Sequence, residues 1–444
     1  MLPNHYNSQQ PITLDAKDVS VIDSAKSFKQ AILDNIARAE QRIYITALYL
    51  QEDDAGKEIL EALYLAKAQK PGLDIKIFVD AHRAQRGLIG EAECLGNRAF
   101  YLDIAQQHSV KINIYGVLVK TKELFGVLHL KGLIFDSRVL YTGASINDVY
   151  LHQADKCRYD RYHLVECQDL AQSMIDYLDR YIVQPGLAPL LNAPLHLDKK
   201  EQKKAAKKQK SLLRRSHYCT KVHQRKPGEL TVVPMVGFGA RGNVVNNSIR
   251  ELFKHSLQSI TLFTPYFNLP AILAKDLRHA LKRGVEVTMV VGDKRANDFY
   301  IPPGKDFSKI GIIPYIYEVL LGRFIKRHQA FIDAGKLKIH LWSFENHSFH
   351  LKGIVVDNRR HMITGSNLNP RAWSLDLENA LLVEDPKRLL EDKWAHELAN
   401  IMQHTVQVKH STELESIQDY PLEVREPIRK LQLTQIDRLL KRFL

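Results

Sequence analysis

Two short stretches of the chain place a histidine, a lysine and an aspartate at one and the same spacing. The first, HLKGLIFD, runs from His129 to Asp136, and the second, HLKGIVVD, runs from His350 to Asp357. A single match to this spacing arises by chance on the order of once in ten chains of this length. Two matches in parallel contexts therefore indicate one kind of site that the chain builds twice.

These residue types predict chemistry at a phosphodiester. Alternate side chains of an extended strand share a face, so His129 and Lys131 point the same way, as do His350 and Lys352. One neutral histidine would attack phosphorus, the other would protonate the leaving oxygen, and the lysines would neutralise charge on the equatorial oxygens. This reaction needs no metal and no cofactor. A lone histidine beside an apolar strand is usually a core residue, but a lysine at the same offset in both stretches has no packing rationale.

The aspartates and the turns that follow them complete the two catalytic sets. Asp136 and Asp357 come at an odd offset from their histidines and point to the opposite face of a straight strand, so they are interpreted as positioning residues. Small residues such as Gly143 and Gly365 then let the backbone approach an anion. The turn side chains predicted to bind the substrate phosphate are Ser145, Asn147, Asn367 and Asn369.

A carboxylate follows each set at a matching place. Glu378 and Asp160 could each hydrogen-bond an imidazole and fix its tautomer. A surface ion pair is the alternative for both. Glu378 is included in the predicted catalytic set, and Asp160 is noted as its counterpart.

The motifs belong to a longer internal repeat of four blocks in the same order. The blocks pair RIYITALYL from Arg42 with SITLFTPYF from Ser259, GLDIKIFVD from Gly72 with GVEVTMVVGD from Gly284, the two motif strands with each other, and YDRYHLVEC from Tyr159 with LENALLVED from Leu377. Short β-branched runs separated by helix-like stretches predict an α/β fold. We expect two similar halves, each a mixed sheet flanked by helices, with the active site between them.

The charge is concentrated between these halves. The predicted boundaries are 1–195 for the first half, 196–230 for a basic linker, and 231–444 for the second half with a basic amphipathic C-terminal segment. Residues 199–226 hold twelve Lys and Arg residues against Glu201 alone, so they carry about +11 of the formal +13. Such local charge indicates an anionic partner, and a solvated linker is the alternative; both can hold.

Length and composition narrow the class of protein. A chain of 444 residues, 45% hydrophobic and 25% charged, can bury a large core and is not expected to be disordered. No stretch approaches the roughly 20 apolar residues that a membrane-spanning helix needs, and the N-terminus lacks the apolar core of a signal peptide. We therefore expect a cytosolic protein. Its four cysteines lack the paired spacing of a zinc site and are assigned no role.

With these residues the chain resembles the phospholipase D superfamily, whose members carry two such motifs at one active site between two α/β halves. Stretches including DAHRAQRGLIG from Asp80, GASINDVYLHQADKCRYDRYHL from Gly143, TPYFNLPAIL from Thr264 and LNPRAWSLDLENA from Leu368 look like the phosphatidylserine synthases of Gram-negative bacteria. These are CDP-diacylglycerol–serine O-phosphatidyltransferases. The resemblance extends over nearly the whole chain.

The resemblance implies a reaction and its partners. CDP-diacylglycerol would be the phosphatidyl donor, L-serine the acceptor and CMP the leaving group, in the step of phospholipid biosynthesis that commits toward phosphatidylethanolamine. It implies a phosphatidyl-histidine intermediate, by analogy with the superfamily on His129 with His350 as general acid and then base, although the sequence leaves open which histidine is the nucleophile. The usual turn of the superfamily, Gly-Ser-x-Asn, has an extra residue in both halves here. Whether Asn367 or Asn369 holds the phosphate therefore stays open.

A lipid donor requires contact with a membrane surface. The basic run could attract anionic headgroups at roughly 1 kcal/mol per residue. Membrane contacts are assigned to Lys203, Lys204, Lys207, Lys208, Arg214 and Arg215. An amphipathic stretch from Ile428 to the C-terminus is a second candidate, with docking on the protein core as its alternative. We expect a cytoplasmic enzyme held peripherally at the inner membrane.

Three other functions fit parts of the sequence. A cardiolipin synthase or phospholipase would use the same motifs with glycerol, another lipid or water as acceptor. A nuclease would use the basic run on a phosphate backbone, but the C-terminal stretch and the specific resemblance oppose this, and no nucleic-acid partner is expected. An inactive lipid-binding scaffold is opposed by the two intact motifs. Residues 80–87 and 297–300 are polar and near strand ends, but the sequence specifies neither the serine and cytidine contacts nor the oligomeric state.

Overall fold

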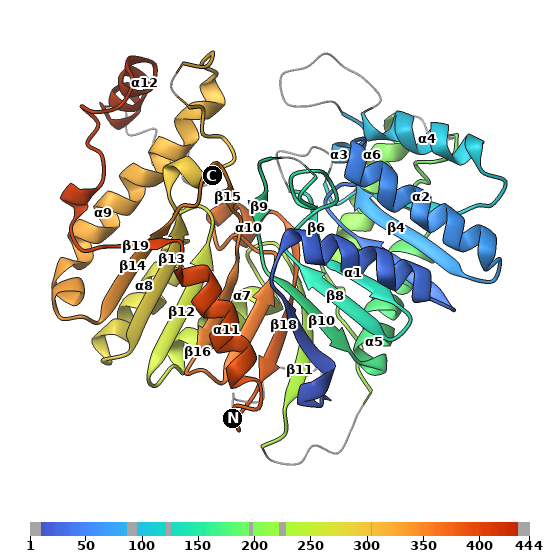
Figure 1. Ribbon diagram of the computed structural model, residues 1–444, viewed down its shortest axis with the longest axis horizontal. Helices are drawn as coiled ribbons and strands as arrows, with labels where there is room; N and C mark the ends of the chain where they lie inside the picture. The colour runs from blue at the N-terminus through green and yellow to red at the C-terminus, as the bar shows by residue number, and fades with distance from the viewer. Residues whose placement is uncertain are drawn as a thin grey trace.

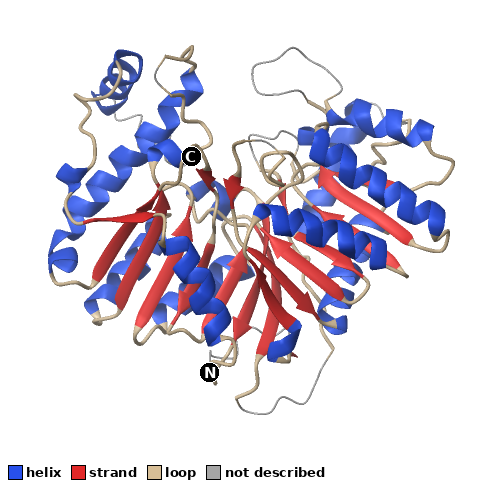
Figure 2. Ribbon diagram, viewed as in Figure 1, coloured by secondary structure: helices blue, strands red, loops and turns tan. Residues whose placement is uncertain are grey.

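The computed structural model describes residues 10–86, 96–120, 126–153, 155–194, 199–221, 228–302 and 304–433. Two mixed β-sheets form the centre of the molecule, and helices pack over them (Figures 1 and 2). The N-terminal half, blue to green in Figure 1, lies beside the C-terminal half, yellow to red. The predicted α/β fold of two similar halves is confirmed.

The first sheet belongs to the N-terminal half. Its spatial order is β2 (Val19–Ile22), β10 (Tyr162–Glu166), β8 (Arg138–Thr142), β7 (Gly132–Phe135), β3 (Arg42–Thr46), β4 (Asp74–Asp80) and β5 (Asn113–Val117). β3, β4 and β5 run parallel to one another, and the other neighbours pair antiparallel. Parallel neighbours need long crossovers, and helices supply them here.

The second sheet repeats this plan. Its order is β1 (Ile12–Thr13), β11 (Thr231–Phe238), β18 (Leu377–Glu384), β17 (Arg360–Thr364), β16 (Gly353–Val356), β12 (Ser259–Thr264), β13 (Glu286–Gly292), β14 (Leu337–Trp342) and β19 (Thr405–Val408), while β6 (Leu128–His129) pairs with β18 off this path. Order and direction from β18 to β14 match those from β10 to β5. A separate small sheet pairs β9 (Arg158–Tyr159) with β15 (Ser348–Phe349). The repeated sequence blocks are thus equivalent strands.

The helices pack on these sheets through apolar faces. They are α1 (Ala25–Arg38), α2 (Asp54–Gln69), α3 (Ala81–Ala84), α4 (Asn97–Gln107), α5 (Gln168–Leu178), α6 (Lys199–Leu213), α7 (Val244–Lys254), α8 (Ala271–Lys282), α9 (Ile313–Asp333), α10 (Pro370–Ser374), α11 (Glu391–Met402) and α12 (Leu422–Leu433), with short turns of other helix types at Ala16–Asp18, Asp179–Val183, Lys294–Ala296, Lys309–Ile312 and Ser411–Glu413. α1 shows the pattern: Ser24 caps its first turn, and Phe28, Ile32 and Ile36 recur every fourth residue on its buried face.

One hydrophobic core is common to both halves. Ile134 and Tyr141 of the first sheet share a buried cluster with Val232 and Leu381 of the second. The Tyr141 hydroxyl also donates a hydrogen bond to the backbone carbonyl of Asn379, at 2.9 Å. Because close-packed interiors resist displacement, this cluster fixes the position of one sheet relative to the other.

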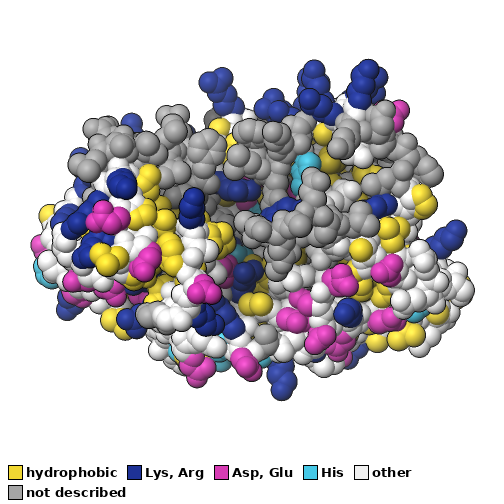
Figure 3. All heavy atoms as spheres, turned by 90° about the horizontal axis from the view of Figure 1, so that it is seen from above, with side chains coloured by type: hydrophobic (Ala, Val, Ile, Leu, Met, Phe, Trp, Pro, Cys, Tyr) yellow, Lys and Arg dark blue, Asp and Glu magenta, His cyan; other side chains and the backbone are white. Residues whose placement is uncertain are grey.

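The predicted basic linker contains a docked helix. In α6, Ala205, Ala206 and Leu213 are buried. The exposed basic side chains of this segment include Lys203, Lys204, Lys207, Lys208, Arg214 and Arg215. Seen from above, Lys and Arg side chains stand out along one edge of the molecule (Figure 3). The charge therefore lies on the outer face of an anchored helix, and residues 222–227 lie outside the described ranges.

Most of the predicted amphipathic C-terminal segment, residues 434–444, also lies outside the described ranges. At its start, Ile428 of α12 shares a buried cluster with Tyr315 and Tyr420. In the ranges given above, no helix combines the length and the apolar character that crossing a bilayer requires.

The motif aspartates join each β-hairpin to the neighbouring strand. Asp136 and Asp357 both have positive φ, +54° and +56°, which aspartate tolerates better than most residues. The Asp136 carboxylate accepts hydrogen bonds from the backbone N–H groups of residues 40–42 at 2.9–3.0 Å, and Asp357 accepts from residues 257–259 at 2.7–3.2 Å. Burial alone would raise the pKa of both carboxyls, but the backbone donors outweigh it and lower each pKa.

We predict that Asp136→Ala lowers the free energy of unfolding by about 2–4 kcal/mol, because hydrogen bonds to a charged group contribute about 1.5–3 kcal/mol each and water reaches part of this site. Urea unfolding at pH 7 measures the loss, with Asp103→Ala on an exposed face of α4 as control. Since the folded pKa of Asp136 is below 3.8, its stabilisation is present above that pH and is lost as the pH falls through the folded pKa. A difference under about 0.5 kcal/mol, within the range of ordinary surface substitutions, would contradict the anchoring role.

Candidate active site

The motif histidines come together because strands cross from one half to the other. β6 of the first half pairs in parallel with β18 of the second, and this register aligns His129 with Glu378. β9 pairs in parallel with β15, and the amide of His350 continues this pairing by donating to the carbonyl of Tyr159 at 2.8 Å. Each motif histidine therefore lies beside the fourth repeated block of the opposite half.

Each imidazole is hydrogen-bonded to a carboxylate of the opposite half. His129 Nδ1 lies 2.9 Å from Glu378 Oε2, and His350 Nδ1 lies 2.8 Å from Asp160 Oδ2. All four side chains are at least nine-tenths buried. A carboxylate at Nδ1 holds the proton there and leaves the lone pair on Nε2. Both carboxylates form the hydrogen bond to an imidazole that the sequence predicted. The spacing did not reveal that each carboxylate bonds the histidine of the other half.

Two ammonium groups extend into the same buried space. Lys131 is 2% exposed and Lys352 is 1% exposed. Lys352 Nζ contacts both ring nitrogens of His350 and lies 3.4 Å from Asp160 Oδ2. Burial lowers the pKa of Lys352 to about 8 and also lowers that of Lys131, which the charge of Lys352 lowers further. Such a site favours binding of an anion, because the negative charge of the anion would stabilise the protonated form of both lysines.

Burial also sets the protonation of the histidines and their partners. It lowers the pKa of His350 to about 4, with Lys352 as the next cause, and lowers that of His129 well below 6.5. Both imidazoles are therefore neutral at pH 7, as a nucleophile or a base must be. Burial raises the pKa of Glu378, and the charges of Lys131 and Lys352 oppose this rise by favouring the carboxylate. At Asp160, Lys352 and His350 outweigh burial and lower the pKa.

The turn glycines make room for the motif side chains. A Cβ on Gly143 would stand 2.9 Å from Asp160 Oδ2 and 3.1 Å from Lys352 Nζ. A Cβ on Gly365 would stand 2.9 Å from Lys131 Cγ. Each glycine thus packs against a lysine of the opposite motif. This is a second reason for a glycine at these positions, besides the close approach of the backbone to an anion that the sequence predicted.

The predicted phosphate-binding side chains occupy two kinds of position. Ser145 is buried and Asn367 is half-buried, at equivalent places in the two turns. Asn147 and Asn369 each accept a hydrogen bond through Oδ1 from the amide three residues later, at 3.1 and 2.9 Å. The last two therefore also cap the chain segment that follows. Phosphate binding by all four stays a prediction.

Asp136 and Asp357, included in the predicted catalytic sets, bind backbone amides beside β3 and β12, and within the described ranges neither forms a hydrogen bond to an imidazole. Their contacts are those of positioning residues, as their offset from the histidines indicated.

Three polar residues lie around His350. The sequence did not single out Tyr150 or Arg158, and Asp298 fell in the polar range 297–300, to which no contact was assigned. The Tyr150 hydroxyl lies 3.0 Å from His350 Nε2 and 3.2 Å from Nδ1. Arg158 lies over the Tyr150 ring, 4.9 Å from its centroid, and its Nε donates to Asp298 Oδ1 at 2.8 Å. No corresponding hydroxyl lies on Nε2 of His129 in the described part of the chain. The family-like stretches that hold these residues were the available signal.

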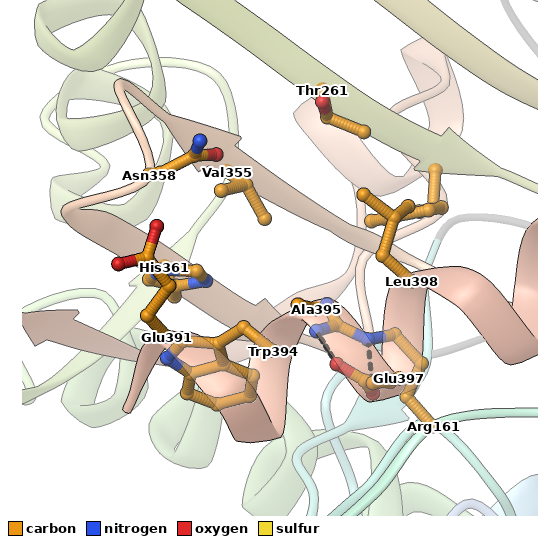
Figure 4. Close-up of a pocket in the computed structure, with 11 residues that line it drawn as sticks. Arg161, Thr261, Val355, Asn358, His361, Glu391, Trp394, Ala395, Glu397 and Leu398 are labelled. Atoms are coloured by element: carbon orange, nitrogen blue, oxygen red, sulfur yellow. Dashed lines mark hydrogen bonds and ion pairs between the residues drawn. The ribbon is translucent and has the colours of Figure 1, made fainter. Parts of the chain in front are cut away.

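A cavity of about 120 Å³ lies between α11 and the second sheet, with Arg161, the neighbour of Asp160 in the chain, in its lining (Figure 4). Arg161 donates to both oxygens of Glu397 there, at 2.8 and 2.6 Å, and its backbone amide donates to Asp160 Oδ1 at 2.9 Å. His361 and Trp394 stack on another wall, with ring centroids 4.5 Å apart. None of the motif histidines or lysines lines this cavity, so it is separate from the space that holds them.

A sheet plan repeated twice, with two His/Lys pairs between the repeats, defines the class of a two-part phospholipase-D-like protein. The family model described as "Cardiolipin synthase, PLD-like domain" matches residues 32–180 and 249–406, one match in each half.

Full-length relatives narrow this class. The CDP-diacylglycerol–serine O-phosphatidyltransferase of Escherichia coli (strain K12) is 44% identical, covering 99% of this chain and 97% of its own, and that of Haemophilus influenzae is 40% identical, covering 98% and 96%. The crystal structure of the H. influenzae Rd KW20 phosphatidylserine synthase superposes with a TM-score of 0.95 at 40% identity, over 99% of this chain and 98% of that one. The chain belongs to the CDP-diacylglycerol–serine O-phosphatidyltransferase family, which confirms the resemblance seen in the sequence.

Proposed function

We propose that the protein transfers the phosphatidyl group of CDP-diacylglycerol to the hydroxyl of L-serine and releases CMP. The observation that carries this proposal is the pair of buried imidazoles, each bonded at Nδ1 to a carboxylate, that share one space with two ammonium groups. These groups supply a nucleophile, an acid–base residue and charge stabilisation for a two-step transfer. The activity named for the full-length relatives supports this donor and acceptor.

In the first step, Nε2 of His129 forms a bond to the phosphatidyl phosphorus, and the bond from that phosphorus to the CMP oxygen breaks. His129 is assigned this role because a hydroxyl covers the equivalent nitrogen of His350. The negative charge of the bound donor raises the pKa of His350 from its low value in the empty site. Protonated His350 can then give its proton to the departing CMP.

In the second step, the serine hydroxyl attacks the phosphorus and the bond to His129 breaks. The hydroxyl proton passes to Nε2 of His350, which is neutral again after the first step. Lys131 and Lys352 stabilise the charge on the non-bridging oxygens in both transition states. Glu378 and Asp160 keep the two rings oriented throughout.

We further propose that the basic face of α6 holds the enzyme peripherally at an anionic membrane surface, the cytoplasmic face of the inner membrane. Support comes from the exposure of its lysines and from a donor whose acyl chains lie in the bilayer. Basic residues near such a surface contribute about 1 kcal/mol each at low salt.

For the reaction, we predict that purified protein in mixed micelles with CDP-diacylglycerol forms phosphatidylserine only when L-serine is added, with or without a chelator. His129→Ala and His350→Ala should each lower turnover roughly 10³-fold or more, because each removes a group that forms or breaks bonds. His279→Ala, at an exposed position of α8, is the matched control. Full activity of either motif variant would refute the mechanism, and CMP release with transfer only to water or glycerol would refute serine as acceptor.

For the membrane contact, we predict that replacing Lys203, Lys204, Lys207 and Lys208 by glutamine weakens binding to anionic vesicles roughly 10²- to 10³-fold at low salt. Activity in detergent micelles should persist, since these side chains lie on the outer face of α6. The control replaces four exposed lysines elsewhere, Lys26, Lys275, Lys282 and Lys338. Unchanged vesicle binding, or binding to neutral vesicles that persists at high salt, would rule out α6 as the anchor.

A further inference from the structure

Beside His350 lies a pair of opposite charges that the transfer steps do not use. Arg158 comes from β9 of the first half and Asp298 from the segment after β13 of the second, and Arg158 Nε donates to Asp298 Oδ1 at 2.8 Å. The Asp298 side chain is 8% exposed and that of Arg158 is 22% exposed. Tyr266 donates to Asp298 Oδ2 at 2.7 Å, and Arg158 donates to the Tyr49 hydroxyl at 3.3 Å.

Tyr150 connects this pair to the reacting nitrogen. Its ring lies against the Arg158 guanidinium, and its hydroxyl is 3.0 Å from His350 Nε2. Because Nδ1–H donates to Asp160, the lone pair of Nε2 accepts from the Tyr150 hydroxyl, and the Lys352 ammonium group contacts the same nitrogen at 2.9 Å. A hydroxyl therefore already occupies the place that the acceptor's hydroxyl must take before its proton can pass to His350. The charged pair lies directly behind this place.

The charges match an amino acid better than a phosphate. An anionic donor needs cations, which Lys131 and Lys352 supply, and the carboxylate of Asp298 would repel it. An α-amino acid carries a carboxylate and an ammonium group within a few bonds of its hydroxyl. The guanidinium fork of Arg158 suits the carboxylate, since such forks bind carboxylates bidentately, and Asp298 suits the ammonium group.

We infer, building on the proposed function, that Arg158 and Asp298 bind the carboxylate and the ammonium group of the acceptor amino acid. Tyr150 holds Nε2 of His350 until the hydroxyl of the acceptor replaces its own. The subsite selects a zwitterionic amino-acid alcohol over neutral alcohols and over water, and so determines which product the two-histidine chemistry makes.

A purely structural role for the pair has a different consequence. Arg158 and Asp298 come from opposite halves, so the pair also links the halves. Loss of such a link would lower the rates with every acceptor alike, because the shape of the whole site would change. Loss of a binding group lowers the rates only with acceptors that carry the matching charge.

The test compares three acceptors that share a primary hydroxyl: L-serine, ethanolamine without the carboxylate, and glycerate without the ammonium group. Arg158→Gln should lower kcat/KM roughly 10- to 100-fold for L-serine and glycerate, mainly through KM, because a charged hydrogen bond is lost. Ethanolamine should be far less affected. Asp298→Asn should do the same for L-serine and ethanolamine, with glycerate far less affected.

Two controls separate binding from folding. CMP release without any acceptor reports the rate of the first step in each variant, and the acceptor rates are compared as ratios to it, because Asp298 also raises the pKa of His350. Arg250→Gln, which removes a comparable ion pair to Asp276 at 2.6 Å in α7 and α8, should leave all rates unchanged.

Equal losses for all three acceptors, or an unchanged KM for L-serine in both variants, would overturn the subsite and leave the proposed function intact. Wild-type protein that uses ethanolamine as well as L-serine would also overturn it, and this arm needs no variant to fold. Wild-type protein that forms no phosphatidylserine at all would instead refute the proposed function.

Discussion

The structure depends on one constraint: the imidazole of each motif is hydrogen-bonded to a carboxylate from the other half of the chain. Glu378 serves His129 and Asp160 serves His350. Neither half alone contains a complete pair, so the two repeats can act only when their relative position is fixed. The shared hydrophobic core, the pairing of β6 with β18 and the pairing of β9 with β15 all maintain that position.

Burial then sets the electrostatics of the site. Two lysines without access to water are costly unless negative charge lies nearby, and the two carboxylates supply part of it. The same burial keeps both imidazoles neutral at pH 7. In the proposed mechanism, the phosphodiester of the donor brings the remaining negative charge, which stabilises the ammonium groups and raises the pKa of His350. Binding of the donor then prepares His350 to act as the acid in the first step.

Because the chain repeats its sequence blocks, much of the fold and part of the site were predictable from the sequence. The two motifs and their flanking blocks gave the paired strands, the two halves and the convergence of His129, Lys131, His350 and Lys352. The exchange of Glu378 and Asp160 between halves was not predictable, because strand crossing depends on contacts almost 250 residues apart along the chain, such as that between His129 and Glu378. Tyr150 and Arg158 are not matched by the same residue type in the other half, so spacing could not single them out, and Asp298 was included only in the polar range 297–300. Helix α6 was assigned to a linker on its charge, although Ala205, Ala206, Gln209 and Leu213 recur at helical spacing.

The most direct test of the exchange is NMR of protein with ¹⁵N-labelled histidine at pH 7, in wild type, Glu378→Gln and Asp160→Asn. The account predicts that His129 and His350 are neutral with the proton on Nδ1. Glu378→Gln should shift the ring nitrogens of His129 and leave those of His350 nearly unchanged, and Asp160→Asn should do the reverse. Imidazolium at both positions, or a shift of each histidine only with the carboxylate of its own half, would contradict the account.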